Sequence, residues 1–181
     1  MRLRGLRYAV LVADGVEDLE YWVTVMRLRE EGAEVISVGI DTQPRQGKNG
    51  LAVRADVTAD RVSVDDVDGL VIPGGWAPDK LRRDPAVIDL VRTAHLRGLP
   101  IGIICHGGSV AISAGIVEGR RATGSLGIKD DLVNAGAIWV DEPAIRDGTL
   151  VWGRVVADIP DFERELVALF ADVAEARRDA E

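Results

Sequence analysis

The chain has very few of the residues that usually carry covalent or metal chemistry. Its 181 residues include one cysteine, Cys105, and two histidines, His95 and His106. A single cysteine excludes a disulfide within the chain and a metal site built from several cysteines. A cysteine–histidine pair must therefore use one of two histidines, and His106 directly follows Cys105 in the sequence.

The chain also lacks a basic balance of charge, a long apolar run and a secretion signal. Its formal net charge of −8 at pH 7 argues against broad nucleic-acid binding, which needs a basic surface. No apolar stretch is long enough to span a membrane, and the run at residues 8–13 is too short for the apolar core of a signal peptide. With its lone cysteine, this chain is predicted to be cytoplasmic, without a nucleic-acid or membrane partner.

What is present is an alternation of short apolar runs and helical patterns, with 47% apolar residues overall. The predicted strands cover residues 8–13, 34–39, 69–72, 101–104, 120–123, 137–140, 143–146 and 150–154. The predicted helices follow Asp14 as far as Gly32 and then cover residues 79–83, 85–97, 110–114, 130–135 and 161–175. Strand, helix and strand at this spacing form βαβ units, so we predict one α/β domain over residues 1–181. Its core covers about residues 8–172, and residues 175–181 form a charged tail that frays.

The most informative stretch places Cys105 directly after the apolar run 101–104. Small residues follow it at Gly107, Gly108 and Ser109. This pattern predicts a sharp strand-to-helix turn that exposes the reactive atom, as described for serine nucleophiles. The helix start is expected to favour the thiolate over the thiol. The alternative is a small buried core cysteine; the combination of strand, Cys-His pair and glycine pair favours a nucleophile.

Glu20 is the strongest candidate for a group that assists the thiol. It follows the carboxyl end of the first strand, which should lie beside the edge that carries Cys105, and it borders an apolar face formed by Leu19 and Val23. A carboxyl group against apolar surface has a raised pKa, so a protonated Glu20 can donate a hydrogen bond to the sulfur. The alternative is a solvated helix carboxylate.

Three further acidic residues have both a functional and a structural interpretation. Glu17 lies three residues after Asp14, a capping-box spacing, and Asp18 can complement the helix dipole. Asp79 either orients His106 or caps the next helical turn. His106 can act as a base only if the bend at Cys105 brings its ring round, because adjacent residues at a helix start do not face each other.

Backbone groups supply the other predicted parts of the site. An acyl or carbonyl reaction needs hydrogen-bond donors for an oxyanion, and we predict the N–H groups of Gly75 and His106 for this role. Gly74 and Glu17 are predicted to lie beside the substrate. His95 is predicted to be a surface residue. For Trp76, Trp139 and Trp152, core packing is favoured over lining a pocket.

Taken together, four segments resemble the PfpI/ThiJ superfamily, and within it the branch of PfpI-type intracellular proteases. The segments are residues 15–20 (GVEDLE), 73–82 (PGGWAPDKLR), 104–107 (ICHG) and 128–136 (IKDDLVNAG). The likeness runs from about residue 8 to residue 170 in the same order. It implies a flavodoxin-like three-layer sandwich, with a mostly parallel central sheet, helices on both faces and a nucleophile elbow at Cys105.

The resemblance also implies roles and partners. Glu20 is implied to be the protonated partner of the thiolate, and Asp79 to reach His106 across a subunit interface. The site is then complete only in a homodimer or a hexamer. No metal or organic cofactor is implied. The implied activities are proteolysis, conversion of methylglyoxal to a hydroxy acid without glutathione, and deglycation of early glyoxal adducts, on a small carbonyl, protein or peptide substrate in stress protection.

Two rival functions follow from the same residues. A non-enzymatic stress protein can use oxidation of Cys105 to sense oxidants or to hold damaged proteins. A glutaminase is disfavoured because no histidine follows His106 in the sequence. The chain departs from the family pattern at Asn49, Gly108, Gly124–Ser125 and Gly153, which leaves its substrate choice open.

Overall fold

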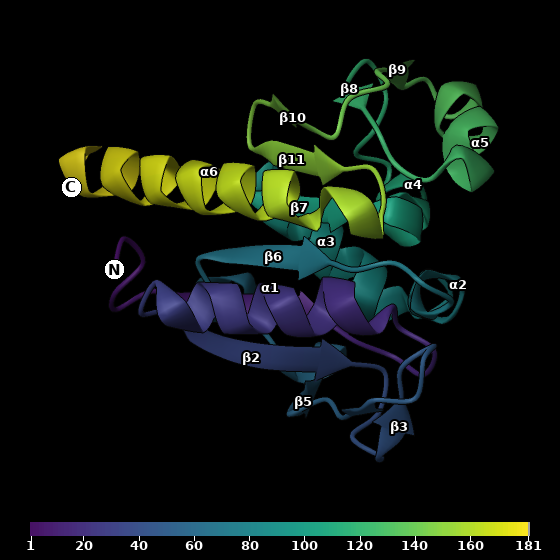
Figure 1. Ribbon diagram of the computed structural model, residues 1–181. Helices are drawn as coiled ribbons and strands as arrows, with labels where there is room; N and C mark the ends of the chain where they lie inside the picture. Colours follow the sequence, from purple (N-terminus) through teal and green to yellow (C-terminus); the bar gives the residue numbers. More distant parts are fainter. Residues whose placement is uncertain (181) are drawn as a thin grey trace.

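The centre of the protein is a seven-stranded sheet, described by a computed structural model that covers residues 1–180 (Figure 1). The strand order is β10-β11-β7-β6-β1-β2-β5, and every pairing is parallel except that of β10 with β11. The strands of this sheet are β1 (Arg7–Leu11), β2 (Glu34–Gly39), β5 (Val57–Thr58), β6 (Gly69–Ile72), β7 (Ile101–Ile104), β10 (Ala144–Asp147) and β11 (Leu150–Gly153). The predicted, mostly parallel α/β sandwich is therefore confirmed.

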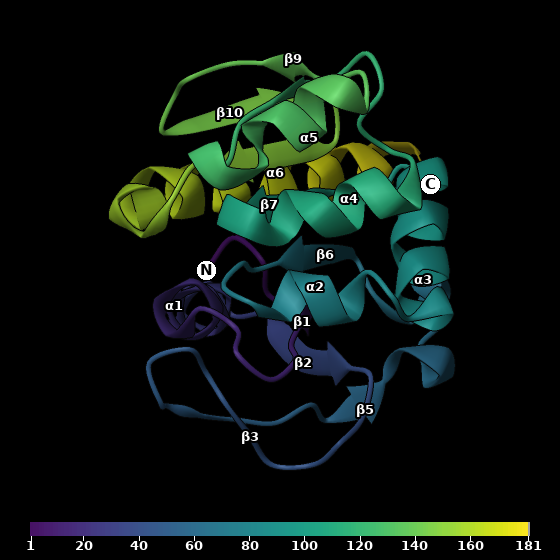
Figure 2. The same cartoon turned by 90° about the vertical axis from the view of Figure 1, so that its right-hand side faces the viewer.

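Helices cover both faces of the sheet. Figure 1 shows α1 (Asp18–Glu30) and α6 (Ile159–Ala180) side by side on the near face, and α3 (Pro85–Leu96) and α4 (Gly108–Ala114) behind it. Figure 2 shows α1 and α3 on opposite sides of the strands, with α2 (Ala77–Leu81) beside α4. Because both faces are covered, β6 and β7 are buried along their whole length. Buried parallel strands have continuous apolar sequences, which explains why these two strands match their predicted bounds.

Smaller elements complete the chain at two ends of the sheet. A two-stranded hairpin of β3 (Arg45–Gln46) and β4 (Ala52–Val53) lies beyond β2, and the parallel pair β8 (Arg121–Ala122) and β9 (Ile138–Trp139) lies near β10 with α5 (Lys129–Asn134). No helix within residues 1–180 is both long and apolar enough to cross a membrane.

Helix α1 differs from its prediction in where it begins and in which face it buries. Its N-cap is Glu17, whereas the sequence analysis placed the cap at Asp14. Leu19 is 48% exposed, although it was assigned to the apolar face, and the buried face instead contains Glu20 and Thr24. The buried face carries polar groups because each of them has a partner elsewhere in the fold, as described below.

Helix α6 is longer than predicted. It was expected to end near Glu175, before a fraying tail, but its helical backbone continues to Ala180. The last residue of that predicted tail, Glu181, lies outside the described residues. The apolar residues of α6, among them Phe162 and Leu166, are buried against the sheet beside α1.

Candidate active site

The site lies where the parallel strands β1, β6 and β7 end, which is the edge where open α/β sheets bind ligands. The loops that follow β1 and β6 are held together by backbone hydrogen bonds. Glu17 donates its N–H to the carbonyl of Gly74 (3.1 Å), and Trp76 donates its N–H to the carbonyl of Gly15 (2.8 Å). Gly75 pairs with Val16 in an isolated bridge and has a φ of 74°. The loops after β1 and β6 therefore form one continuous support beside Cys105.

Cys105 lies on a strained turn directly after β7. Its φ is 58°, and it is the only non-glycine residue among residues 1–180 with a positive φ. A short turn over Cys105–Gly107 leads into α4. A non-glycine residue in this region of the backbone costs about 1–3 kcal/mol and marks sites where geometry serves function. The chain thus has the predicted bend between strand and helix.

The bend brings the His106 ring to the sulfur, although the two residues are neighbours in sequence. The Sγ atom of Cys105 lies 3.3 Å from Nδ1 of His106. The backbone N–H groups of His106 and Gly75 also face the sulfur and lower the pKa of the Cys105 thiol. Burial, and secondly the Glu20 carboxylate, outweigh them and raise this pKa to about 12. The backbone N–H groups therefore favour the thiolate, as expected, but burial has the larger effect on the pKa of Cys105.

Glu20 is the buried carboxyl group of the site. It is fully buried, and its Oε2 accepts a hydrogen bond from the N–H of Gly74 at 2.7 Å. Its Oε1 is buried without a hydrogen-bond partner of normal geometry among the described residues. Burial raises the pKa of Glu20 to about 7, while the Gly74 N–H and the Cys105 thiol act in the opposite direction. A carboxyl group of this kind is poised to hold a proton near neutral pH.

Gly74 is the residue that allows this close approach. A Cβ atom at this position would lie 2.8 Å from Oε2 of Glu20 and 2.9 Å from Cβ of Cys105. Real Cβ atoms do not approach backbone or other Cβ atoms so closely, so a side chain at Gly74 would push the carboxyl group and the cysteine apart. The sequence analysis placed Gly74 beside the substrate; the structure places it between two side chains of the site.

Glu17 and Asp18 are both buried, and their carboxylates form hydrogen bonds with other groups of the protein. Glu17 accepts hydrogen bonds from the N–H groups of Leu19 (2.8 Å) and Glu20 (3.0 Å) and from the side-chain amide of Asn49 (3.1 Å). Asp18 accepts from the backbone N–H groups of Asn49 (2.6 Å) and Leu51 (2.8 Å). The two carboxylates therefore fix the start of α1 and the loop at residues 47–51.

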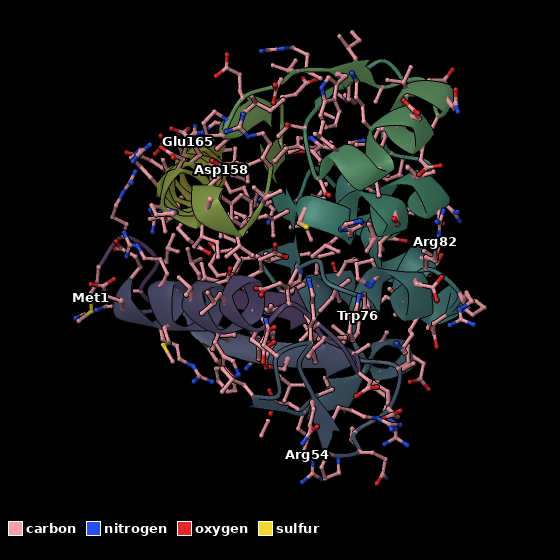
Figure 3. The ribbon with its side chains drawn as sticks, turned by 45° about the vertical axis from the view of Figure 1, so that its right-hand side comes forward. Met1, Arg54, Trp76, Arg82, Asp158 and Glu165 are labelled. Atoms are coloured by element: carbon pink, nitrogen blue, oxygen red, sulfur yellow. The ribbon has the colours of Figure 1, made fainter. Side chains whose placement is uncertain are left out.

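A cleft of about 420 Å³ opens over Cys105. Its lining residues are Glu17, Lys48, Gly75, Trp76, Cys105, His106, Ser125, Val155, Val156 and Ala157. Ser125 belongs to one of the departures from the family pattern noted above, whereas Lys48 and residues 155–157 were not identified from the sequence, because they reach the cleft from distant segments without a recognisable motif. Trp76 is 61% exposed (Figure 3), so its assignment to the core is wrong, whereas Trp152 is fully buried as expected.

Two predicted residues lie apart from the cleft within one chain. Asp79 is on α2, exposed to solvent, and forms an ion pair with Arg83 at 3.1 Å. It contacts neither His106 nor Cys105 among the described residues, and α3 is capped by Asp84 instead. His95 lies on α3 and is half-buried, with burial lowering its pKa. Within residues 1–180, no group of three or more histidine, cysteine or acidic side chains is arranged to hold a metal ion.

The chain is similar in sequence to several known proteins. The pattern of the DJ-1/PfpI family matches residues 7–169. A deglycase of Pyrococcus horikoshii is 40% identical over 164 residues, which cover 91% of this chain and 99% of that protein. General stress protein 18 of Bacillus subtilis is 37% identical over 168 residues, covering 91% of this chain and 98% of that protein.

A solved structure has the same fold. A protein from Anabaena variabilis with a DJ-1/ThiJ/PfpI-like domain and a ferritin-like domain is 34% identical and superposes with a TM-score of 0.88. The likeness covers 90% of this chain and 47% of that two-domain chain. This chain therefore spans about half the length of that protein.

Proposed function

The chain belongs to the DJ-1/PfpI family, and we propose that it is a cysteine-dependent enzyme that acts on reactive carbonyl groups. The observation that carries the proposal is the elbow at Cys105, where a φ of 58° brings Sγ to 3.3 Å from Nδ1 of His106. A nucleophile and a base within reach of each other, beside backbone donors, are the elements that covalent catalysis requires. Deglycation and removal of free α-oxo aldehydes are the reactions we consider first.

His106 is suited to remove the thiol proton. Burial, followed by the charge of Lys48, lowers its pKa, which keeps the ring unprotonated and free to accept a proton but also makes it a weaker base. Glu20 serves the same step by remaining protonated, because a second negative charge beside the sulfur would oppose thiolate formation. One proton is thus kept on Glu20 while another moves from Cys105 to His106.

The thiolate then adds to the carbonyl carbon of the substrate. A carbon–sulfur bond forms, and the carbonyl electron pair moves to oxygen, within reach of the N–H of Gly75 and the proton on His106. With methylglyoxal, the hydrogen of the former aldehyde carbon moves as a proton to the adjacent carbonyl carbon, which yields a thioester. Water hydrolyses the thioester to lactate and restores the thiol, so the net reaction consumes methylglyoxal and water. Glu20 and His106 carry the protons in these steps.

The test is the consumption of methylglyoxal without glutathione by the wild type and by Cys105→Ala. We expect the substitution to abolish turnover and to leave the circular dichroism spectrum unchanged. His95→Gln provides a matched control, because it alters the other histidine of the chain outside the cleft. Full activity in Cys105→Ala would disprove the proposal.

A second function is supported by the same cysteine. The single thiol lies beside a carboxyl group that can donate a hydrogen bond, and a relative is named a general stress protein. We propose that, if carbonyl turnover is absent, two equivalents of peroxide oxidise Cys105 to the sulfinic acid, with release of two waters. Intact mass after peroxide treatment tests this: a stoichiometric gain of two oxygens favours the sensor, and no gain rejects it.

Asp79 can take part in the proposed reaction only if the chain forms an oligomer. It is exposed on α2 and paired with Arg83, so it is available to a second chain. We propose that the chain forms a homodimer or hexamer in which Asp79 of one copy orients His106 of another. A monomer by light scattering with full activity would reject this part of the proposal.

A further inference from the structure

The cleft contains one cationic side chain, that of Lys48, which forms no ion pair within residues 1–180. The ionisable residues that line it are Glu17, Lys48, Cys105 and His106. Glu17 accepts hydrogen bonds from two backbone N–H groups and from the side-chain amide of Asn49, so its carboxylate oxygens are already bonded within the protein. None of the ion pairs within residues 1–180 includes Lys48. The cleft therefore presents a cationic side chain without an ion-pair partner among the described residues, in a chain whose net charge is −8.

The backbone that carries Lys48 is fixed at both sides. Lys48 donates its N–H to the carbonyl of Val16 at 2.8 Å, and the N–H groups of Asn49 and Leu51 bind the carboxylate of Asp18. Gly47 packs directly on that carboxylate, and any side chain there would collide with it. The ammonium group lies 5.9 Å from the centre of the Trp76 ring. The loop that carries Lys48 is thus held by contacts with two separate segments, residues 16–18 and Trp76.

The charge of Lys48 reaches the reacting groups. It is the second cause, after burial, that lowers the pKa of His106, and it opposes in part the rise in the pKa of Glu20 that burial causes. The cleft also has an apolar wall, which is formed by Val155, Val156 and Ala157. A ligand that fits both walls has an anionic end toward Lys48 and an uncharged end toward residues 155–157, with its reactive carbon over Cys105.

We propose that the cleft selects carbonyl compounds that carry a carboxylate, and that Lys48 recognises this carboxylate. The statement that the ligand is a carbonyl compound rests on the proposed function. The preference for an anion does not, since it follows from the charge and shape of the cleft. Attraction between partly exposed opposite charges a few ångströms apart changes a rate by about fivefold at low ionic strength and decreases with added salt.

The first test uses alkylation of the single cysteine and needs no turnover. Iodoacetate and iodoacetamide transfer the same carbon to the Cys105 sulfur with loss of iodide, and they differ in one negative charge. We measure the ratio of the two rate constants by intact mass. Lys48→Gln should lower the iodoacetate-to-iodoacetamide ratio about fivefold, and Lys48→Arg should keep it. Because both reagents sense the same thiol, the ratio cancels changes in its reactivity.

Lys129→Gln is the matched control for this measurement. Lys129 also lies 5.9 Å from a tryptophan ring, that of Trp139, but it does not line the cleft. Its substitution removes the same charge from the molecule and should leave the ratio at the wild-type value. A ratio unchanged by Lys48→Gln overturns the proposal, as does a wild-type ratio insensitive to about 0.5 M NaCl, which needs no variant to fold.

The second test connects the charge to the substrate class. Methylglyoxal forms hemithioacetals with N-acetylcysteine and with N-acetylcysteine amide, which share the reactive group and differ in one carboxylate. Wild-type kcat/KM should favour the acid, and Lys48→Gln should reduce that preference about fivefold. Equal kcat/KM values for the two adducts in the wild type overturn the assigned substrate class. Absence of turnover with both adducts counts against the proposed function, while the alkylation ratio still decides the role of Lys48.

Discussion

Two buried glutamates, Glu20 at the cleft and Glu163 between α1 and α6, are closely alike in burial, pKa and hydrogen bonding. They differ in their neighbours. Both are almost fully buried, and burial raises the pKa of each to about 7. Each has one bonded oxygen: Glu20 accepts from the N–H of Gly74, and Glu163 accepts from the hydroxyl of Thr24. In each, the other oxygen is buried without a partner among the described residues.

The difference is that only Glu20 lies beside a nucleophile. Its charge contributes to the raised pKa of Cys105, whereas the ionisable group that acts on Glu163 is Arg27. A perturbed pKa alone therefore does not identify a catalytic group. The neighbouring thiol distinguishes the two, and each glutamate serves as the control for the other.

The largest expected difference is in turnover. Glu20→Gln removes a group that can give and take a proton during the reaction, so methylglyoxal consumption should fall about 100-fold. Glu163→Gln makes the same chemical change between α1 and α6 and should leave turnover within about twofold of the wild type. Equal losses in the two variants would mean that Glu20 acts on structure rather than on chemistry.

The next effect concerns stability, and here the two glutamates should behave alike. The folded-state pKa of Glu163 is raised from 4.5 to about 7, so its contribution is complete below pH 4.5 and is lost as the pH rises through about 7. The loss amounts to roughly 3 kcal/mol in the free energy of unfolding. Glu163→Gln and Glu20→Gln should each reduce this decline, so both variants gain stability relative to wild type at alkaline pH.

Urea unfolding at about pH 5 and about pH 8 measures this difference. The gain at the higher pH should exceed the change at the lower pH in both variants. If the wild-type free energy of unfolding is the same at both pH values, ionisation of these carboxyl groups in the folded protein costs little. That result would contradict the effect expected from their burial.

The smallest effect is on the thiol itself. The Glu20 carboxylate is the second cause, after burial, of the raised Cys105 pKa, so Glu20→Gln should lower that pKa while burial keeps it above its ordinary value. The pH dependence of alkylation by iodoacetamide reports the change. Glu163→Gln should have the wild-type profile, and an equal shift in both variants would contradict a direct contact between Glu20 and the sulfur.

Local sequence was sufficient to predict the bounds of strands that are covered by helices on both faces. Residues 34–39, 69–72 and 101–104 are strands at the predicted bounds, because a strand covered by helices on both faces needs only a short apolar run. The bend at Cys105 was also predictable, since an apolar strand followed by small residues leaves the chain little choice but to turn sharply.

What the sequence could not provide are features that depend on partners far along the chain. Glu20 and Thr24 are buried because they bond to Gly74 and Glu163, which lie 54 and 139 residues away from them. These long-range bonds reverse the amphipathic pattern of α1, in which the apolar Leu19 faces solvent. Lys48 reaches the cleft for a similar reason, through the hydrogen bonds of Asp18 to the loop at residues 47–51.

That loop has a consequence for how the protein can diversify. Asp18 holds it through backbone N–H groups, and Gly47 contributes only the absence of a side chain. The side chain at Lys48 takes no part in this attachment, so it can change without disturbing the scaffold. The main chain of this loop attaches it to the rim of the cleft. Its selectivity lies in a side chain, which evolution or design can replace while the attachment stays the same.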